Sequence, residues 1–221
     1  DDHGYVWFGT QSGLDRFDGF RMKPYLYDDK NDQSIPNDSV DEIQQDADGN
    51  LWVHTSLGYC LYDYETEQFD RKPELRLKSL GIDGAPYKLL IDSKKNMWMS
   101  VYGQGLYFVD TKNQTAYCFR FSKKHGMGTL PDYQVSNISE QHGTAVVTFN
   151  NGYMCRLDGY AQRVVWSDDF LLRNKLVTDN MAYAYVDGKN NYWVSTNRGC
   201  LVYSTSQKKW FMSGREFLAS Q

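Results

Sequence analysis

The sequence lacks any run of about 18 apolar residues, the length that a membrane-spanning helix needs. Its first residues, Asp1, Asp2 and His3, also lack the basic and then apolar layout of a signal peptide. As printed, the chain is expected to be soluble. The missing signal does not by itself assign a cytoplasmic location, because a mature or trimmed chain reads the same way.

Basic stretches are scarce as well. The formal net charge is -4 and the isoelectric point is about 5.6. Proteins that bind nucleic acid concentrate Lys and Arg on one surface, because neutralising phosphates releases counterions. The sequence therefore argues against a nucleic-acid partner.

Paired cysteines are absent. The four cysteines are far apart in the sequence and form no C-x-x-C pair, which excludes the usual zinc and redox motifs. Each lies among aromatic or aliphatic neighbours, so we expect them to be small, buried strand residues; they are Cys60, Cys118, Cys155 and Cys200. No cofactor is expected.

Aromatic residues and glycines are plentiful. Tyr, Phe and Trp make up 15% of the chain, beside 18 glycines and only 5 prolines. Aromatics favour strands, and glycines favour the turns between them. An all-β fold with many tight turns is the expected class.

A repeated pattern dominates the sequence: an acidic and glycine-containing turn, an apolar strand with a central Trp, a Gly turn, and a second strand rich in Tyr and Phe. Trp7, Trp52, Trp98 and Trp193 mark the clear copies, at intervals of 45, 46 and 95 residues. The double interval predicts a degenerate copy near residue 146. Residues 144–158 supply it, with Val146 at the position of the Trp.

A period of about 45 residues with four short strands is typical of a β-propeller blade. In the second unit we expect strands at 40–45, 51–55, 60–64 and 68–71. The prediction is about five four-stranded antiparallel blades, the first incomplete, with nineteen strands in all; the repeats are 1–36, 37–82, 83–131, 132–178 and 179–221. An incomplete first blade favours a fragment of a larger propeller, or an arc that is open or closed by a partner chain, over a self-closed ring of five.

The repeat Asp-x-x-Gly-x-hydrophobic-Trp-hydrophobic-Gly/Ser-Thr, followed by Gly-Leu-x-x-Tyr/Phe-Asp, closely resembles the two-component regulator propeller repeat. It is found in the periplasmic sensor region of Bacteroides-type hybrid two-component histidine kinases. The sequence departs from it at 139–158, where the Trp and the acidic turn are lost, and at Val101–Gly103, where one residue is inserted. The resemblance implies an extracytoplasmic, non-catalytic sensor of carbohydrate breakdown products. It also implies a parent protein that is membrane-anchored, dimeric and a histidine kinase.

The sequence shows no recognisable set of residues for catalysis or metal binding. No Gly-x-Ser-x-Gly motif is present, and the histidines are scattered with no pair at metal spacing; they are His3, His54, His125 and His142. His54 stands where other copies have Gly or Ser, which makes it a candidate for a blade interface. The segment at 46–50 resembles a calcium-binding loop but lacks the later glutamate, so we interpret it as a turn. The pairs Asp28–Asp29 and Asp168–Asp169 could in principle supply the two carboxylates of a glycosidase, but we interpret them as solvated loop residues.

Ligand contacts are instead expected in the turns that follow the Trp strands, because function concentrates in propeller loops. These turns offer amides, a guanidinium and an aromatic ring suited to an oligosaccharide; the candidates are Gln11, Tyr102, Gln104, Asn150, Asn197 and Arg198. Two alternatives to a sensor stay open at this point. One is a protein-binding propeller scaffold, and the other is a propeller enzyme of the glycosidase or lyase kind.

Overall fold

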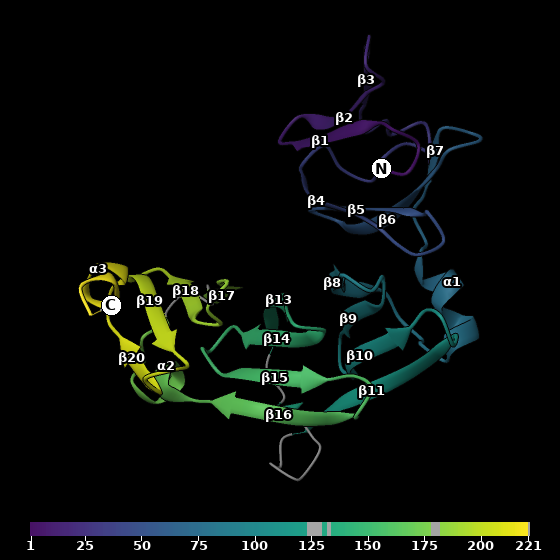
Figure 1. Cartoon of the computed structure of the whole chain (residues 1–221). Helices are drawn as coiled ribbons and strands as arrows, with labels where there is room; N and C mark the ends of the chain where they lie inside the picture. The colour runs from purple at the N-terminus through teal and green to yellow at the C-terminus, as the bar shows by residue number, and fades with distance from the viewer. Residues whose placement is uncertain (123–129, 132–133, 178–181, 221) are drawn as a thin grey trace.

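The computed structural model describes residues 1–122, 130–131, 134–177 and 182–220, and within them five antiparallel sheets follow one another along the chain (Figure 1). We call them blades I to V. Blade I has three strands, and the other blades have a ladder of four antiparallel strands joined in sequence order. This confirms the predicted fold class.

The strand bounds follow the sequence pattern closely. They are β1 (Val6–Thr10), β2 (Gly13–Phe17) and β3 (Met22–Tyr25) in blade I; β4 (Val40–Gln45), β5 (Leu51–Thr55), β6 (Gly58–Asp63) and β7 (Gln68–Asp70) in blade II; β8 (Pro86–Ile91), β9 (Met97–Val101), β10 (Gly105–Asp110) and β11 (Thr115–Ser122) in blade III; β13 (Val135–Gln141), β14 (Thr144–Phe149), β15 (Met154–Asp158) and β16 (Arg163–Asp168) in blade IV; and β17 (Ala182–Val186), β18 (Tyr192–Thr196), β19 (Gly199–Ser204) and β20 (Lys209–Phe211) in blade V. The degenerate copy near residue 146 is thus a real hairpin, β14–β15.

Twenty strands are described rather than nineteen. The additional one is β12 (Leu130–Pro131), which pairs in parallel with the end of β11 and widens the sheet of blade III to five strands. The pairing extends the outer edge of the blade, where an unpaired strand otherwise leaves backbone groups without partners.

The first strands of successive complete blades, β4, β8, β13 and β17, lie against one another. The fourth strands therefore lie on the outer side of the arc. The turns between second and third strands lie at the same end of each blade as the start of the first strand. We call this the bulge end, for a feature described below.

Apolar faces of neighbouring blades form the cores. Each interface combines one face of two sheets with a residue from the connection between the blades. These connecting residues are Ile35, Leu77, Leu130 and Leu171 for the four interfaces in order. Because the same construction recurs, each connection seals the core between the blade it leaves and the blade it enters.

Two of these connecting residues, Leu77 and Leu171, lie in short helices, and the described chain has four such helices. They are α1 (Glu74–Leu77), η1 (Lys78–Leu80), α2 (Phe170–Arg173) and α3 (Gly214–Leu218). In blade V, Phe217 of α3 packs on Trp193 and Phe211, although no further blade of the described chain lies beyond them.

The strand-end Thr of the repeat has a structural role in the turn that follows it. The Oγ1 atoms of Thr10, Thr55 and Thr196 each donate a hydrogen bond to the carbonyl of the Gly three residues on, at 2.9 to 3.0 Å. Those glycines have positive φ values of 109° to 121°, which other residues rarely adopt. The Thr-x-x-Gly part of the repeat therefore encodes this hairpin.

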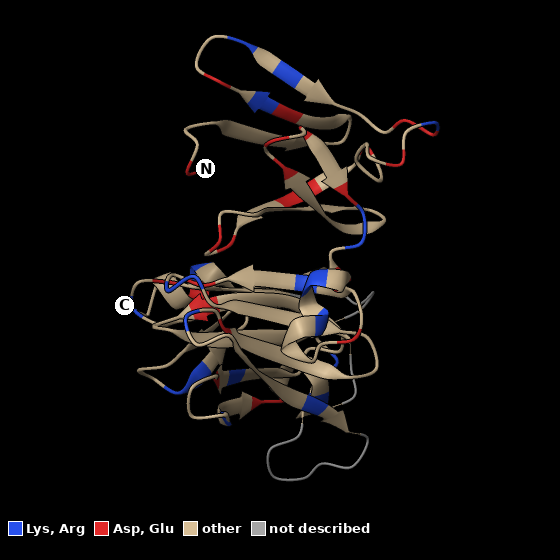
Figure 2. Ribbon diagram, turned by 90° about the vertical axis from the view of Figure 1, so that its right-hand side faces the viewer, with Lys and Arg blue, Asp and Glu red and all other residues tan. Residues whose placement is uncertain are grey.

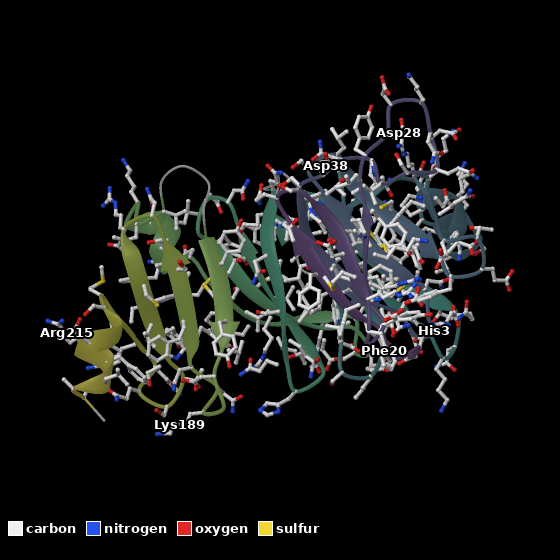
Figure 3. All side chains as sticks on the ribbon, turned by 90° about the horizontal axis from the view of Figure 1, so that it is seen from above. His3, Phe20, Asp28, Asp38, Lys189 and Arg215 are labelled. Atoms are coloured by element: carbon white, nitrogen blue, oxygen red, sulfur yellow. The ribbon has the colours of Figure 1, made fainter. Side chains whose placement is uncertain are left out.

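Blades I and V lie at the two ends of the arc. Seen from above, His3 and Phe20 lie near one end and Lys189 and Arg215 near the other (Figure 3). The expectation that all four cysteines are buried holds for Cys60 and Cys155 but is wrong for Cys200, which is exposed, while Cys118 is half-buried. Cys200 occupies the position of Tyr59 in blade II, whose ring faces the next blade.

Charged residues lie mostly in the turns and loops, while most of the strand ribbon belongs to uncharged residues (Figure 2). No helix within the described ranges is long and apolar enough to cross a membrane.

Candidate ligand-binding site

The first strands of blades II, III and IV share a β-bulge at their start. The register shifts between Val40 and Glu42, between Pro86 and Lys88, and between Val135 and Asn137. One residue of each strand is thereby left out of the ladder; these are Asp41, Tyr87 and Ser136. Bulges re-aim side chains and are frequent beside functional sites.

Each bulged residue makes a polar contact with the second strand of its own blade. Asp41 Oδ1 lies 2.6 Å from His54 Nδ1, Ser100 Oγ donates to the Tyr87 hydroxyl at 2.9 Å, and Ser136 Oγ donates to Thr148 Oγ1 at 3.1 Å. The three contacts involve equivalent positions of three blades. They form a row of polar pairs at the bulge end.

A pocket of about 480 Å³ opens beside the first two of these pairs. That volume is in the range of sites for small ligands. Blades II, III and IV all contribute to its lining, which is His54, Ser56, Leu57, Gly58, Ala85, Pro86, Tyr87, Lys88, Tyr102 and Gln134.

A stacked pair of tyrosines forms one wall. The Tyr87 and Tyr102 rings lie 4.0 Å apart between centroids with planes 21° apart, and Tyr102 is 64% exposed. Gln134 Nε2 donates to the Tyr102 hydroxyl at 3.2 Å, and its Oε1 accepts from Asn150 Nδ2 at 2.9 Å. An exposed ring held from behind in this way is a rigid platform for an apolar ligand face.

His54 forms part of another wall. Because an ionised Asp41 can only accept, Nδ1 of His54 is the donor in their contact, and Nε2 is left without a partner within the described ranges. The His54 ring also packs on Tyr59, with 4.4 Å between centroids. The Tyr59 hydroxyl in turn donates to Glu42 Oε2 at 2.6 Å.

Burial fixes the protonation of the two inner tyrosines. It raises the pKa of Tyr59 far above its ordinary value, and the Glu42 carboxylate adds to the effect. Burial also raises the pKa of Tyr87, against the opposing effect of the hydrogen bonds from Ser100 and Val135. Both phenols therefore stay neutral and serve as hydrogen-bonding groups rather than as acids or bases.

The structure brings together two of the six predicted site residues. Tyr102 lines the pocket, and Asn150 supports it through Gln134. Gln104 is not among the lining residues, and its amide is engaged elsewhere: it donates to the Asp83 carbonyl and accepts from the Tyr107 hydroxyl at 2.5 Å. Gln104 is therefore a positioning residue for the local turn.

The other three candidates lie apart from this pocket. Gln11 accepts from Ser39 Oγ at 3.1 Å in blade I. Asn197 and Arg198 are exposed in the equivalent turn of blade V. A prediction based on the repeat places one candidate turn in every blade. Blades far apart in the arc cannot contribute to one pocket, so only the turns of neighbouring blades meet.

Several lining residues were not predicted, among them Leu57, Lys88 and Gln134. A bulge leaves no mark in a single sequence, and the first strands carry no motif. The one available signal was His54, which breaks the repeat at its position. Of the other histidines, His125 lies outside the described residues.

The interpretation of the acidic pairs as solvated loop residues holds for Asp28 and Asp29, which are exposed, but is wrong for Asp168 and Asp169, which are half-buried at the end of β16 and directly after it. Asp28 and Asp168 each accept a backbone N–H two residues on, and Asp169 pairs with Arg173 at 2.8 Å. Within the described part of the chain, no group of three or more His, Cys, Asp or Glu side chains is placed to hold a metal ion.

Comparison with known sequences places the chain beside signalling proteins. Residues 34–56 match the family model described as "Two component regulator propeller". Over 96 residues, 41% of this chain, it is 31% identical to "Histidine kinase P4" of Formosa agariphila. The matched part is 7% of that protein, so the chain corresponds to a small portion of this relative.

Comparison with solved structures supports the fold. The extracellular domain of the hybrid two component system BT3049 of B. thetaiotaomicron matches 96% of this chain with a TM-score of 0.66 and 21% identity, over 28% of its own length. The extracellular domain of BT4673, from the same organism, matches 96% with a TM-score of 0.62 and 19% identity, over 30% of its own length. PorZ, a surface component of the type-IX secretion system of Porphyromonas gingivalis, matches 94% with a TM-score of 0.53 and 15% identity, over 32% of its own length.

Proposed function

We propose that this chain, which is built from two-component regulator propeller repeats, is a non-catalytic, ligand-binding segment of a hybrid two-component sensor histidine kinase. The ligand is an oligosaccharide from carbohydrate breakdown, and the segment lies in the periplasm. Kinase activity, the membrane anchor and dimerisation belong to other parts of the parent protein. The family match and the extracellular relatives of the same fold support this proposal.

The observation that carries the ligand-binding part is the pocket at the bulge end. Its exposed Tyr102 ring is an apolar platform, and the hydroxyls and amide around it match the donors and acceptors of a sugar. Three blades contribute to the pocket, so an occupied pocket links blades II, III and IV. A sensor needs such a coupling between ligand and arrangement of its parts.

The test is calorimetric titration of the purified segment with a panel of neutral and acidic oligosaccharides. Replacement of Tyr102 by Ala is expected to lower affinity about tenfold, which corresponds to about 1.4 kcal/mol. Tyr160→Ala is the matched control, because Tyr160 is 52% exposed but lies in the β15–β16 turn at the opposite end of blade IV. Absence of binding across the panel, or equal losses in both variants, would contradict the proposal.

A further inference from the structure

The residue that follows each bulge has the same place in blades II, III and IV: Glu42, Lys88 and Asn137. Two of the three have protein partners. Glu42 accepts from the Tyr59 hydroxyl at 2.6 Å and from Gln44 Nε2 at 2.8 Å. Asn137 Nδ2 donates to the Ala184 carbonyl of blade V at 3.0 Å.

Lys88 differs from both. Its ammonium group makes no hydrogen bond or ion pair with any other part of the chain that the structure describes. The side chain is half-buried and lines the pocket beside Tyr87 and Tyr102. Its ammonium group is therefore available to a ligand in this pocket.

The charges around Lys88 leave it as the unmatched group. Among the residues that the structure describes, no carboxylate lines the pocket. The two carboxylates of β4 are already engaged, Asp41 with His54 and Glu42 with Tyr59 and Gln44. The charge that the described lining offers to a ligand is therefore the positive charge of Lys88.

We propose that Lys88 is a specificity-determining residue that binds an oxyanion, a carboxylate or a sulfate, carried by the saccharide whose ring packs on Tyr102. This inference rests on the proposed function and narrows it to acidic saccharides. An ammonium group binds such oxyanions through charge-assisted hydrogen bonds, which are stronger than neutral ones.

The experiment uses pairs of oligosaccharides that share one skeleton. Oligogalacturonides are compared with their neutral methyl esters, and sulfated galactan oligosaccharides with their desulfated forms. Wild type is expected to bind the acidic member of at least one pair roughly ten times more tightly than the neutral member. The pair that shows this difference identifies carboxylate or sulfate as the oxyanion.

The variants separate the two proposals. Lys88→Gln is expected to lose the preference for the acidic member, with affinity for it falling roughly 5- to 30-fold, while Lys88→Arg retains most of it. Tyr102→Ala lowers affinity for both members. Lys112→Gln, an exposed lysine in the β10–β11 turn at the opposite end of blade III, is the control and leaves affinity unchanged.

The outcomes are distinct. Equal affinity for both members of every pair, or unchanged affinity in Lys88→Gln with an unchanged melting temperature, overturns the role of Lys88 and leaves the proposed function standing. Absence of binding to every acidic and neutral member overturns the proposed function, and the role of Lys88 falls with it.

Discussion

At the scale of single residues, the repeated Asp and Trp are partners. The carboxylate at the first-to-second strand turn accepts the indole N–H from six residues on: Asp46 from Trp52 at 2.8 Å, Asp92 from Trp98 at 3.2 Å and Asp187 from Trp193 at 2.8 Å. Asp1 and Trp7 make the same contact in blade I. Each bond ties a turn to a ring that packs between blades or, in blade V, against α3, so the turn and the core depend on one another.

Blade IV shows what replaces the pair when it is lost. Val146 stands at the position of the Trp, and Trp166 of the outer strand packs instead against Tyr192 and Tyr203 at the interface with blade V. Gln141 ends β13 and accepts from the Tyr192 hydroxyl at 2.8 Å. A different set of residues thus fills the same interface.

Asp46→Ala is expected to lower the free energy of unfolding by about 2 to 4 kcal/mol, because it removes an acceptor that several buried or half-buried N–H groups share. Besides the indole, Asp46 accepts the backbone N–H groups of Asp48 and Asn50. Urea unfolding measures the change, with Asp29→Ala, an exposed loop carboxylate, as control. A loss no greater than in the control would show that the indole bond is not a stabilising contact.

The sequence analysis identified the repeated Trp and Asp but did not predict the hydrogen bond between them. A Trp every 45 residues is visible by eye, and Asp beside Gly is a turn signal in itself. The contact between them crosses a hairpin, and the turn interpretation alone explained the Asp. The pocket was harder to predict, because Lys88 and Gln134 belong to no motif. They line the same pocket only because their blades are neighbours in the fold.

At the scale of elements, the connections between blades contribute to the cores as the strands do. The segment between β3 and β4 is held by Arg71, which follows β7. Its guanidinium donates to the carbonyls of Asn31, Ser34 and Ile35 and to Ser34 Oγ, at 2.7 to 3.2 Å. Ile35, which seals the core between blades I and II, is thereby fixed in place.

Arg71→Met is expected to lower the free energy of unfolding by about 1 to 3 kcal/mol, since the connection loses its donors while the aliphatic stem is kept. Cleavage by a protease within 26–39 should become faster, because the segment opens locally more often. Limited proteolysis with mass spectrometry locates the cut sites, and Arg173→Met, an exposed arginine, is the comparison. Unchanged cleavage of this segment would mean that Ile35 alone anchors it.

The connecting helices were missed by sequence analysis for a physical reason. Each has three to five residues, too few to establish a helical period, and packing rather than intrinsic preference makes it helical. Strands were predictable because their alternation and turns repeat in every unit. The second-unit prediction differs from β4–β7 by two residues at most.

At the scale of the whole molecule, the two end blades differ from the inner ones in having one face without a neighbouring blade. On blade I, Val6 is 50% exposed, Phe8 46% and Met22 51%. The equivalents of the first two in blade II, Leu51 and Val53, are buried against blade I. The face of blade I is thus an interface surface of the repeat that is open to water.

The 221-residue chain is therefore expected to self-associate as its concentration rises, because such an apolar face is a site of pairing. Phe8→Asp should weaken the association several-fold and leave the melting temperature nearly unchanged, since Phe8 is only half covered. Sedimentation velocity over a concentration series measures this, with Leu75→Asp on α1 as control. Association that is equally strong in Phe8→Asp would assign it to another surface.

The three β-bulges have a consequence for how such a protein diversifies. Asp41, Tyr87 and Ser136 stand outside the ladder, so exchanging them leaves the strand register intact. Duplicated blades can therefore acquire different side chains at the bulge end while their strands keep the same pairing. A carboxylic acid, a phenol and an alcohol already occupy the bulged position in blades II, III and IV. Substitution at this position can therefore change ligand specificity without a change of fold.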